Sequence, residues 1–466
     1  MKLRCRNIFL VLLVIIGNRV HAALPDWPQL YDTSTVPALN VQLRETDWNT
    51  ILADETFDVE VPALFWANQD GPESAILVSI RRKSATPING KVSFKIDINE
   101  YEDDDPRAQG LWHGVKKLSL ENGDDVDIVS EGIAWAMHRI AVEQGIYPAG
   151  HLPGKANWAT LTPYLTQGCI AEPCGPFDLG EVFLVLDPLV YLNVEQPDKS
   201  FLKNRDLWIS EETWLYKQDE PALPAEIKEA GCPEEVPNSP VVNALQCAPF
   251  IAGREGGSRG KKDRNSEPSV ETCDMAVVNE LVDMDILLVQ AAIGAFSANR
   301  DDTFGNEHNY YFLDYSAPGN CQILPDPYAL EARKRLHFPW DLDASLTKVD
   351  RNVYGDLQGN RRKIKLSQTG YQRLLLEDYN NGELAFRTMY NTALLEMAGE
   401  DFMAGLFDTL DDIQLVIGDA LEADPNSKIS SAGSHIQNVK NFLSERANIV
   451  REQVCLDNPG LNGCAP

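Results

Sequence analysis

The sequence predicts an α+β protein with a β-rich N-terminal lobe and an α-rich C-terminal lobe. Two observations lead to this prediction. Between residues 36 and 120, short stretches alternate polar and apolar residues or are rich in β-branched residues, which is typical of strands. Beyond residue 343, apolar residues recur mainly at helical spacing. A chain of 466 residues is also long enough to bury a large core in two closely packed lobes.

Residues 1–22 have the pattern of a secretory signal peptide. Three basic residues precede an apolar run from Ile8 to Ile16, and Val20-His21-Ala22 provides a cleavage site. The run is too short to span a bilayer stably, and no later stretch is long and apolar enough to do so. We therefore expect a protein that is secreted, periplasmic or held at the cell surface, without a membrane span.

The chain is strongly acidic. Removal of residues 1–22 takes away four basic residues and no acidic one, which changes the net charge from −29 to −33. Such a surface disfavours binding to nucleic acid or to an anionic membrane, because both carry negative charge.

Eight of the nine cysteines lie beyond the predicted signal peptide. An even number in an exported chain predicts disulfides, and an oxidising compartment allows them to persist. Short loops favour Cys169–Cys174 and Cys455–Cys464. Cys232–Cys247 is a plausible third pair, and Cys273 and Cys321 would then remain for each other.

The β-rich N-terminal lobe is expected to span residues 23–216. Its predicted elements are strands at 36–43, 76–80, 92–98, 118–120 and 181–186, and a helix at 126–144. Residues 217–272 are rich in Pro, Gly, Glu and Lys, which predicts an insertion or linker.

The helical C-terminal lobe is expected to span residues 273–454 and to carry the catalytic loop. Its first helix, Met275 to Phe296, has a wide apolar face and leads directly into Asn299-Arg300-Asp301. Further helices are predicted at 383–397, 411–422 and 434–454, followed by a cysteine-containing tail at 455–466.

Acidic and amide side chains are concentrated between Asn299 and Asp343. Asp301 is followed five residues later by Asn306. Asp341 and Asp343 come directly after the largely apolar segment 336–340. Phosphoryl transfer requires an acceptor that orients the nucleophile and metal ligands that screen the phosphates. The pattern therefore predicts Asp301 as the base, and Asn306, Asp341 and Asp343 as metal ligands. Asn309 is a second candidate amide ligand.

Basic residues in the N-terminal lobe are candidates for phosphate contacts. Lys95 lies between Phe94 and Ile96 in a predicted strand, so its ammonium is expected to project into a cleft between the lobes. We expect Glu131, in the predicted helix at 126–144, to orient Lys95 by an ion pair. Arg81 and Lys83 close another strand and add possible phosphate contacts.

These segments together resemble the spore coat protein H (CotH) kinase family. The resemblance rests on the order of Ile80–Ser84, Lys91–Ile96, Asn193–Lys203, Asn299–Phe312, Pro339–Asp343, and Asn441–Arg446 with Val450-Arg451. It implies an atypical protein-kinase-like fold, exported from the cell, that uses ATP and Mg²⁺ (or Mn²⁺) to phosphorylate Ser or Thr of a partner that is an exported or surface protein. By position it gives the base role to Asp301, metal roles to Asn306 and Asp341, and phosphate contact to Lys95.

Two other functions remain open from the sequence. The first is a catalytically weak or inactive kinase-fold protein that acts as a surface structural or adhesion protein, for which an acidic surface would select partners electrostatically. The second is a secreted hydrolase that uses Asp301 and Asp341 as paired carboxylates.

Overall fold

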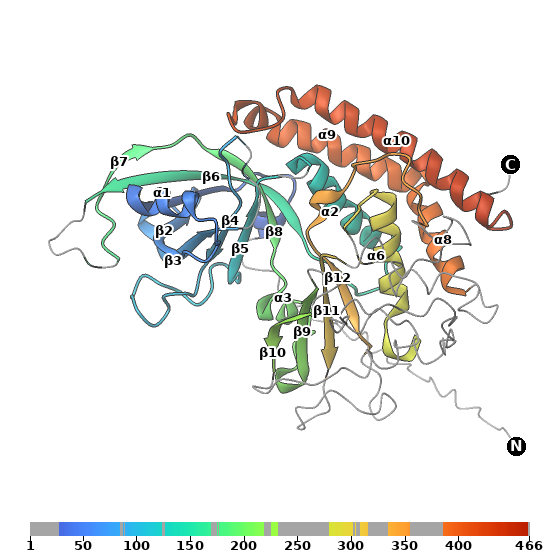
Figure 1. Ribbon diagram of the computed structural model, residues 1–466, viewed down its shortest axis with the longest axis horizontal. Helices are drawn as coiled ribbons and strands as arrows, with labels where there is room; N and C mark the ends of the chain where they lie inside the picture. The colour runs from blue at the N-terminus through green and yellow to red at the C-terminus, as the bar shows by residue number, and fades with distance from the viewer. Residues whose placement is uncertain are drawn as a thin grey trace, which may run out of the picture.

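The computed structural model describes residues 28–83, 87, 89–123, 126–168, 175, 177–218, 225–231, 279–301, 303, 308–315, 334–354 and 385–464. In these ranges the chain forms a β-barrel, a second and smaller sheet, and a group of helices that lies beside the barrel (Figure 1). None of the helices in these ranges is long and apolar enough to cross a membrane.

The N-terminal part is a barrel in which the hydrogen-bonded strands return to the first strand. The strand order is β1 (Ala38–Arg44), β2 (Val61–Ala67), β3 (Ile76–Arg82), β4 (Phe94–Asp97), β5 (Lys117–Glu121), β8 (Leu189–Glu195) and β6 (Ala156–Gln167). The ring closes because β1 pairs with β6 in parallel, from Ala38 opposite Thr160 to Arg44 opposite Thr166. β7 (Glu181–Val185) extends the sheet by pairing with β6.

The barrel interior is filled with apolar side chains. Alternation along β4 directs Phe94 and Ile96 into this core, and Leu118 and Leu120 of β5 join them. The short helix α1 (Glu45–Ala53) contributes Trp48, whose ring lies 5.3 Å from that of Phe94. The same alternation directs the polar residues of β4 and β5 to the outer face of the barrel.

The second sheet has four antiparallel strands in the order β10 (Glu226–Ala230), β9 (Thr213–Gln218), β11 (Tyr310–Tyr315) and β12 (Leu336–Pro339). A buried pair of charged groups stabilises it: Arg335 donates to Asp314 from Nε at 2.8 Å and from Nη2 at 2.6 Å. The predicted boundary after residue 216 falls inside β9. Part of the predicted insertion, residues 226–230, is therefore a strand.

The helices share one core with the second sheet and with the outer face of β8. They are α2 (Ile128–Glu143), α3 (Lys199–Lys203), α6 (Met284–Phe296), α8 (Ala385–Met397), α9 (Glu400–Ala423) and α10 (Ala432–Asp457). Figure 1 shows α9 and α10 side by side along one edge of the molecule, with α2 beneath them. Because α2 also packs on β6 and β8, it connects the barrel to the helical part.

A buried ion pair also joins the barrel to the helices. Lys91, just before β4, places its Nζ 2.9 Å from Oδ2 of Asp424, which follows α9. The two side chains are 2% and 0% exposed. Asp424 also accepts a hydrogen bond from the backbone N of Val190 in β8 at 3.1 Å.

The predicted division into a β-rich N-terminal part and a helical C-terminal part is confirmed at that level. Two features differ from the expectation: the N-terminal part is a closed barrel, and the C-terminal half contains β11 and β12. Both depend on pairings between distant segments, which local periodicity does not report. The helix predicted from Met275 is described as α6 only from Met284, where Asp283 accepts a hydrogen bond from the backbone N of Ile286.

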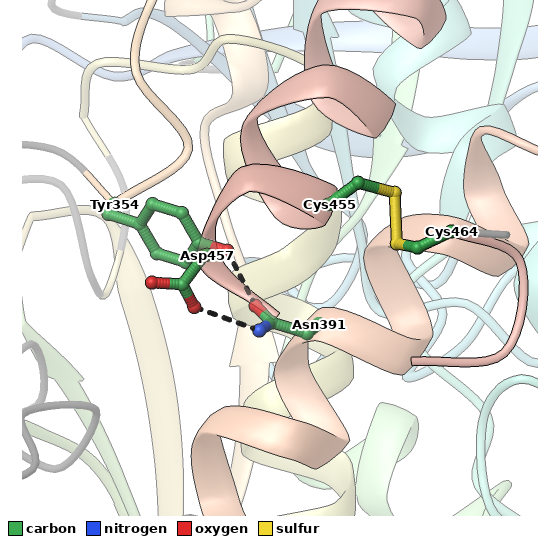
Figure 2. The surroundings of a disulfide bond; sticks show 5 residues. All are labelled: Tyr354, Asn391, Cys455, Asp457 and Cys464. Carbon is green, nitrogen blue, oxygen red and sulfur yellow. Dashed lines mark hydrogen bonds between the residues drawn. A yellow bond between two sulfur atoms is a disulfide. The ribbon is translucent and has the colours of Figure 1, made fainter. Parts of the chain in front are cut away.

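The predicted disulfide Cys455–Cys464 is confirmed, with a Cα–Cα distance of 5.2 Å (Figure 2). It ties the tail to the last turns of α10. Beside it, Asn391 donates to Asp457 at 3.1 Å and accepts from Tyr354 at 2.9 Å. The other six cysteines and the predicted signal peptide lie outside the described residues.

Candidate active site

A cavity of about 410 Å³ lies between the outer face of the barrel and the second sheet. It contains six of the residues that the sequence predicts for the site: Arg81, Lys83, Lys95, Glu131, Asp341 and Asp343. The barrel supplies the first three, α2 supplies Glu131, and the segment after β12 supplies the two aspartates. Segments that are up to about 260 residues apart in sequence therefore meet at one hollow.

The barrel wall of this cavity concentrates positive charge. Arg81 of β3 lies directly opposite Lys95 of β4, and Lys117 of β5 lies opposite Asp97. Asp97 is shared between Lys117 at 3.3 Å and Lys95 at 3.8 Å. Burial, together with the neighbouring charges of Lys117 and Arg81, lowers the pKa of Lys95 to about 8, although Asp97 and Glu60 oppose the shift. An anion in the cavity would relieve this repulsion.

Lys83 has a different environment from Lys95. Its Nζ donates to Ser119 Oγ at 2.7 Å and forms an ion pair with Glu121. Ser119 in turn donates to Glu121 at 2.6 Å. The Lys83 ammonium also lies 5.5 Å from the ring centroid of Trp340, which is a cation–π distance. Lys83 is thus held in place by contacts from β5 and from the segment after β12.

The position of α2 decides where Glu131 lies. Asp127 caps the helix by accepting from the backbone N of Val129 and of Ser130, each at 2.9 Å. Gly132 allows α2 to approach β6, because a Cβ at this residue would come within 2.2 Å of the Trp158 ring. Glu131, which precedes Gly132 in α2, is thereby positioned in the wall of the cavity.

Glu131 is a buried carboxyl, only 1% exposed, and its Oε2 has no hydrogen-bond partner among the described residues. Burial raises its pKa well above the usual range, and Glu121 and Asp341 raise it further, against the effect of Lys83. The expected ion pair between Lys95 and Glu131 is absent: Lys95 pairs with Asp97, and Lys83 is the cation near Glu131. The reason is the register of β3, β4 and β5, which places Lys95 beside Arg81 and Lys117 on the barrel.

The two predicted metal ligands after β12 follow a strained turn. Asp341 has φ 55°, and Asn309, just before β11, has φ 56°. These two positions are adjacent because Trp340 N donates to the Asn309 carbonyl at 3.2 Å. Left-handed backbone at residues other than glycine is uncommon and occurs often at functional sites. Asp343 follows in a short 3₁₀ helix, Leu342–Ala344.

Asp301 and Asn309 do not line the cavity. Asn309 lines a smaller cavity together with Pro339 and Leu342. Asp301 follows α6, and its carboxylate lies 3.1 Å from Arg300 Nε. The same loop contacts the segment that carries Asp343, since Arg300 N donates to Ala344 O at 3.4 Å. Asn306 lies outside the described residues.

The residues of the cavity suit a metal–polyphosphate ligand in their chemistry. Cations line the barrel side, Asp341 and Asp343 offer oxygen ligands, and Glu131 adds a buried carboxyl. Within the described part of the chain, no group of three or more His, Cys, Asp or Glu residues could hold a metal ion by itself. Mg²⁺ usually takes only one or two protein carboxylates and completes its shell with water and phosphate oxygens, so this sparse set fits it.

Several residues of the cavity were not predicted from the sequence. They include Lys117, Lys217, Lys228, Glu121, Asp198, Glu229, Tyr311 and Trp340. Alternation in Lys117-Leu-Ser-Leu-Glu121 is a signal that places Lys117 and Glu121 on the same face as Ser119. Lys228 lies in the segment 217–272, whose composition predicted an insertion, so the strand β10 was not recognised.

Fold and cavity together define an α+β protein with a mixed-charge site between a barrel and a second sheet. The family model described as CotH kinase protein matches residues 190–450. This match covers more than half of the chain, and the chain belongs to the CotH kinase family. It includes the second sheet, Asp341 and Asp343, whereas the strands that carry Arg81, Lys83 and Lys95 precede it. A comparison with curated proteins finds no match.

Proposed function

We propose that this protein is an exported protein kinase that transfers the γ-phosphoryl group of ATP to a Ser or Thr hydroxyl of an exported or surface protein. One observation carries the proposal: barrel cations and the Asp341–Asp343 segment line the same cavity. A protein with net charge −29 gathers basic side chains on this wall, which favours a highly charged anion as the ligand.

In this proposal Arg81, Lys83 and Lys95 contact phosphate oxygens, and Asp341 and Asp343 hold Mg²⁺ or Mn²⁺ with Asn306 and Asn309 as further candidates. The bound metal screens phosphate charge, which is its main contribution to phosphoryl transfer. Glu131 provides a buried carboxyl beside Lys83, and burial favours its protonated form because it raises the pKa. Asp301 is the proposed base, on a loop that reaches the Asp343 segment through the contact of Arg300 with Ala344. It takes the proton of the acceptor hydroxyl as the hydroxyl oxygen bonds to the γ-phosphorus, and the bond from that phosphorus to the β-phosphate oxygen breaks, which leaves ADP.

Export is supported by two features. Residues 1–22 have a signal-peptide pattern, and Cys455–Cys464 is a disulfide, a bond that persists in oxidising compartments. We propose that the protein acts outside the cytoplasm, in the periplasm, at the surface or in the medium.

The experiment is a phosphorylation assay with radiolabelled ATP and Mg²⁺ or Mn²⁺, which measures self-phosphorylation and phosphorylation of casein. We expect incorporation by the wild type, and loss of at least two orders of magnitude in Asp341→Asn and Asp301→Asn. Asn is chosen at 341 because it tolerates left-handed backbone. The control is Asp350→Asn, whose side chain is 68% exposed. Equal incorporation by the control and Asp341→Asn would remove the proposed metal role.

A second candidate function is that of a surface structural or adhesion protein with a kinase fold and weak or no catalysis. The observation that favours it is the place of Asp301, which does not line the cavity. Under this alternative Asp301→Asn leaves partner capture unchanged, and the partner is captured without nucleotide. Incorporation of phosphate that depends on Asp301 would exclude it.

A further inference from the structure

A second cavity, of about 300 Å³, lies beside α2 and is separate from the candidate active site. One face of α2 forms part of its wall, through Gly132, Trp135, Ala136, Arg139, Val142 and Glu143. The opposite wall is the segment Leu152–Ala156 that leads into β6, with Tyr31 and Thr33 at one side. Most of this lining is apolar, unlike the cation-rich wall of the first cavity.

Lys155, which is half-buried, introduces a positive charge into this largely apolar lining. Among the described residues, its ammonium makes no hydrogen bond or ion pair. Glu195, the carboxylate that acts on the Lys155 charge, is already engaged: it accepts from Arg205 at 3.1 and 2.6 Å, and from the backbone N of Lys155 at 3.2 Å. Burial lowers the pKa of Lys155; Glu195 opposes this shift, whereas the nearby Arg205 adds to it.

Arg139, the other cation in the lining of this cavity, already has a counter-ion. Arg139 donates to Glu143 at 2.9 Å, which balances its charge within α2, and to Thr409 Oγ1 of α9 at 2.9 Å. The cavity therefore offers one cation without a counter-ion and an apolar surface around it, to which the buried Trp135 contributes the largest ring.

We propose that this second cavity binds a small organic monoanion: a carboxylic acid whose carboxylate pairs with Lys155 and whose hydrocarbon part lies against Trp135, Ala136 and Val142. A carboxylate there satisfies the Lys155 ammonium, and the hydrocarbon part covers apolar surface. The volume is at the lower end of small-molecule pockets, which fits a compact ligand. A polyphosphate does not fit this chemistry, because only one cation is available.

The test uses the full mature chain and sodium decanoate below its micelle concentration. Bound 8-anilinonaphthalene-1-sulfonate reports the cavity by its fluorescence, and decanoate is titrated to displace it. Decanol, which has the same chain length and no charge, is titrated in parallel. We expect saturable displacement by decanoate in the wild type, and affinity for decanoate that is about tenfold or more weaker in Lys155→Met. The affinity for decanol should stay within twofold.

Two further variants separate a charge effect from a folding defect. Lys155→Arg keeps the positive charge and should recover most of the affinity for decanoate. Lys348→Met removes a remote lysine whose side chain is 69% exposed and should bind like the wild type. Saturable displacement in the wild type that is equal in Lys155→Met, or no saturable displacement in the wild type, would overturn the proposal. The assay contains no nucleotide, so its outcome is independent of the proposed kinase activity.

Discussion

Arg81 and Lys95 lie directly opposite each other on β3 and β4, so that two cations face the same cavity from neighbouring strands. Like charges in directly opposed positions destabilise a sheet. Lys117 adds a third positive charge on the next strand. The two neighbouring carboxylates, Glu60 and Asp97, balance only part of this charge. The arrangement is therefore better suited to binding an anion than to stabilising the free barrel.

Removal of the Lys95 charge should stabilise the protein at neutral pH. Its pKa is about 8 in the folded protein and 10.5 in the unfolded chain, so between these values the unfolded chain binds more protons. The free energy of unfolding of the wild type therefore rises with pH over this window. We expect Lys95→Met to be more stable by up to about 1 kcal/mol below pH 8, and the difference to vanish towards pH 10.5. Urea unfolding at a series of pH values measures it.

The matched control for Lys95→Met is Lys348→Met, in which an exposed lysine outside the cavity is removed. It should change neither the free energy of unfolding nor its pH dependence by more than about 0.5 kcal/mol. A Lys95→Met protein that is less stable than the wild type at pH 7 would show that Asp97 and Glu60 outweigh the repulsion.

Glu131→Gln should increase stability at neutral pH. The pKa of Glu131 is raised in the folded protein, so the folded state binds more protons than the unfolded chain above pH 4.5. The wild type therefore loses stability as pH rises from 4.5 towards the folded-state pKa. Gln has the size of the neutral carboxyl and no such dependence, and we expect a gain of about 1 kcal/mol or more at pH 7. The control is Glu452→Gln, on the exposed face of α10, which should keep the pH dependence of the wild-type free energy of unfolding.

The buried pair Lys91–Asp424 should be essential for stability. Asp424→Asn removes the counter-ion of a lysine that is 2% exposed, and a buried charge without a partner costs about 3–5 kcal/mol. Asp411→Asn breaks the ion pair with Lys440, in which the aspartate is 60% exposed, and should cost less than about 1 kcal/mol. Chemical denaturation compares the two. Similar losses in both variants would mean that the barrel–helix connection does not depend on this charge.

The disulfide Cys455–Cys464 closes a loop with a sequence separation of 9. Replacement of both cysteines by alanine should lower the free energy of unfolding by roughly 2–3 kcal/mol, mainly because the unfolded chain regains freedom. The double variant is preferable to a reducing agent, which would act on the other cysteines as well. Unfolding in urea without reductant measures the loss, and an unchanged midpoint would show that Asp457, held by Asn391 and Arg387, fixes the tail alone.

The sequence predicted which segments meet at the cavity better than it predicted how they pair. Alternation around Lys95 and the acidic segment at Asp341 follow from local patterns, and both residues line the cavity. That Lys83 rather than Lys95 lies near Glu131 depends on the register of β3, β4 and β5, which no local pattern reports. The same holds for barrel closure, because β1 and β6 are separated by more than a hundred residues.

The place of Asp301 shows a further limit. The helical pattern before it predicts α6, but the direction of the chain after Phe296 depends on tertiary contacts, such as Leu346 N donating to Ser297 O at 2.7 Å. Lys228 was missed for another reason: β10 is short and exposed, so it has little apolar periodicity.

Thermal unfolding with and without Mg²⁺–ATP tests most directly whether the cavity between barrel and second sheet binds a metal–nucleotide. Ligand at 100 times its dissociation constant stabilises the folded state by about 2.7 kcal/mol, which gives a clear shift in Tm. We predict this shift in the wild type and in Asp350→Asn, and its loss or strong reduction in Asp341→Asn and Lys83→Met. No shift in the wild type, or the same shift in all four proteins, would contradict the account.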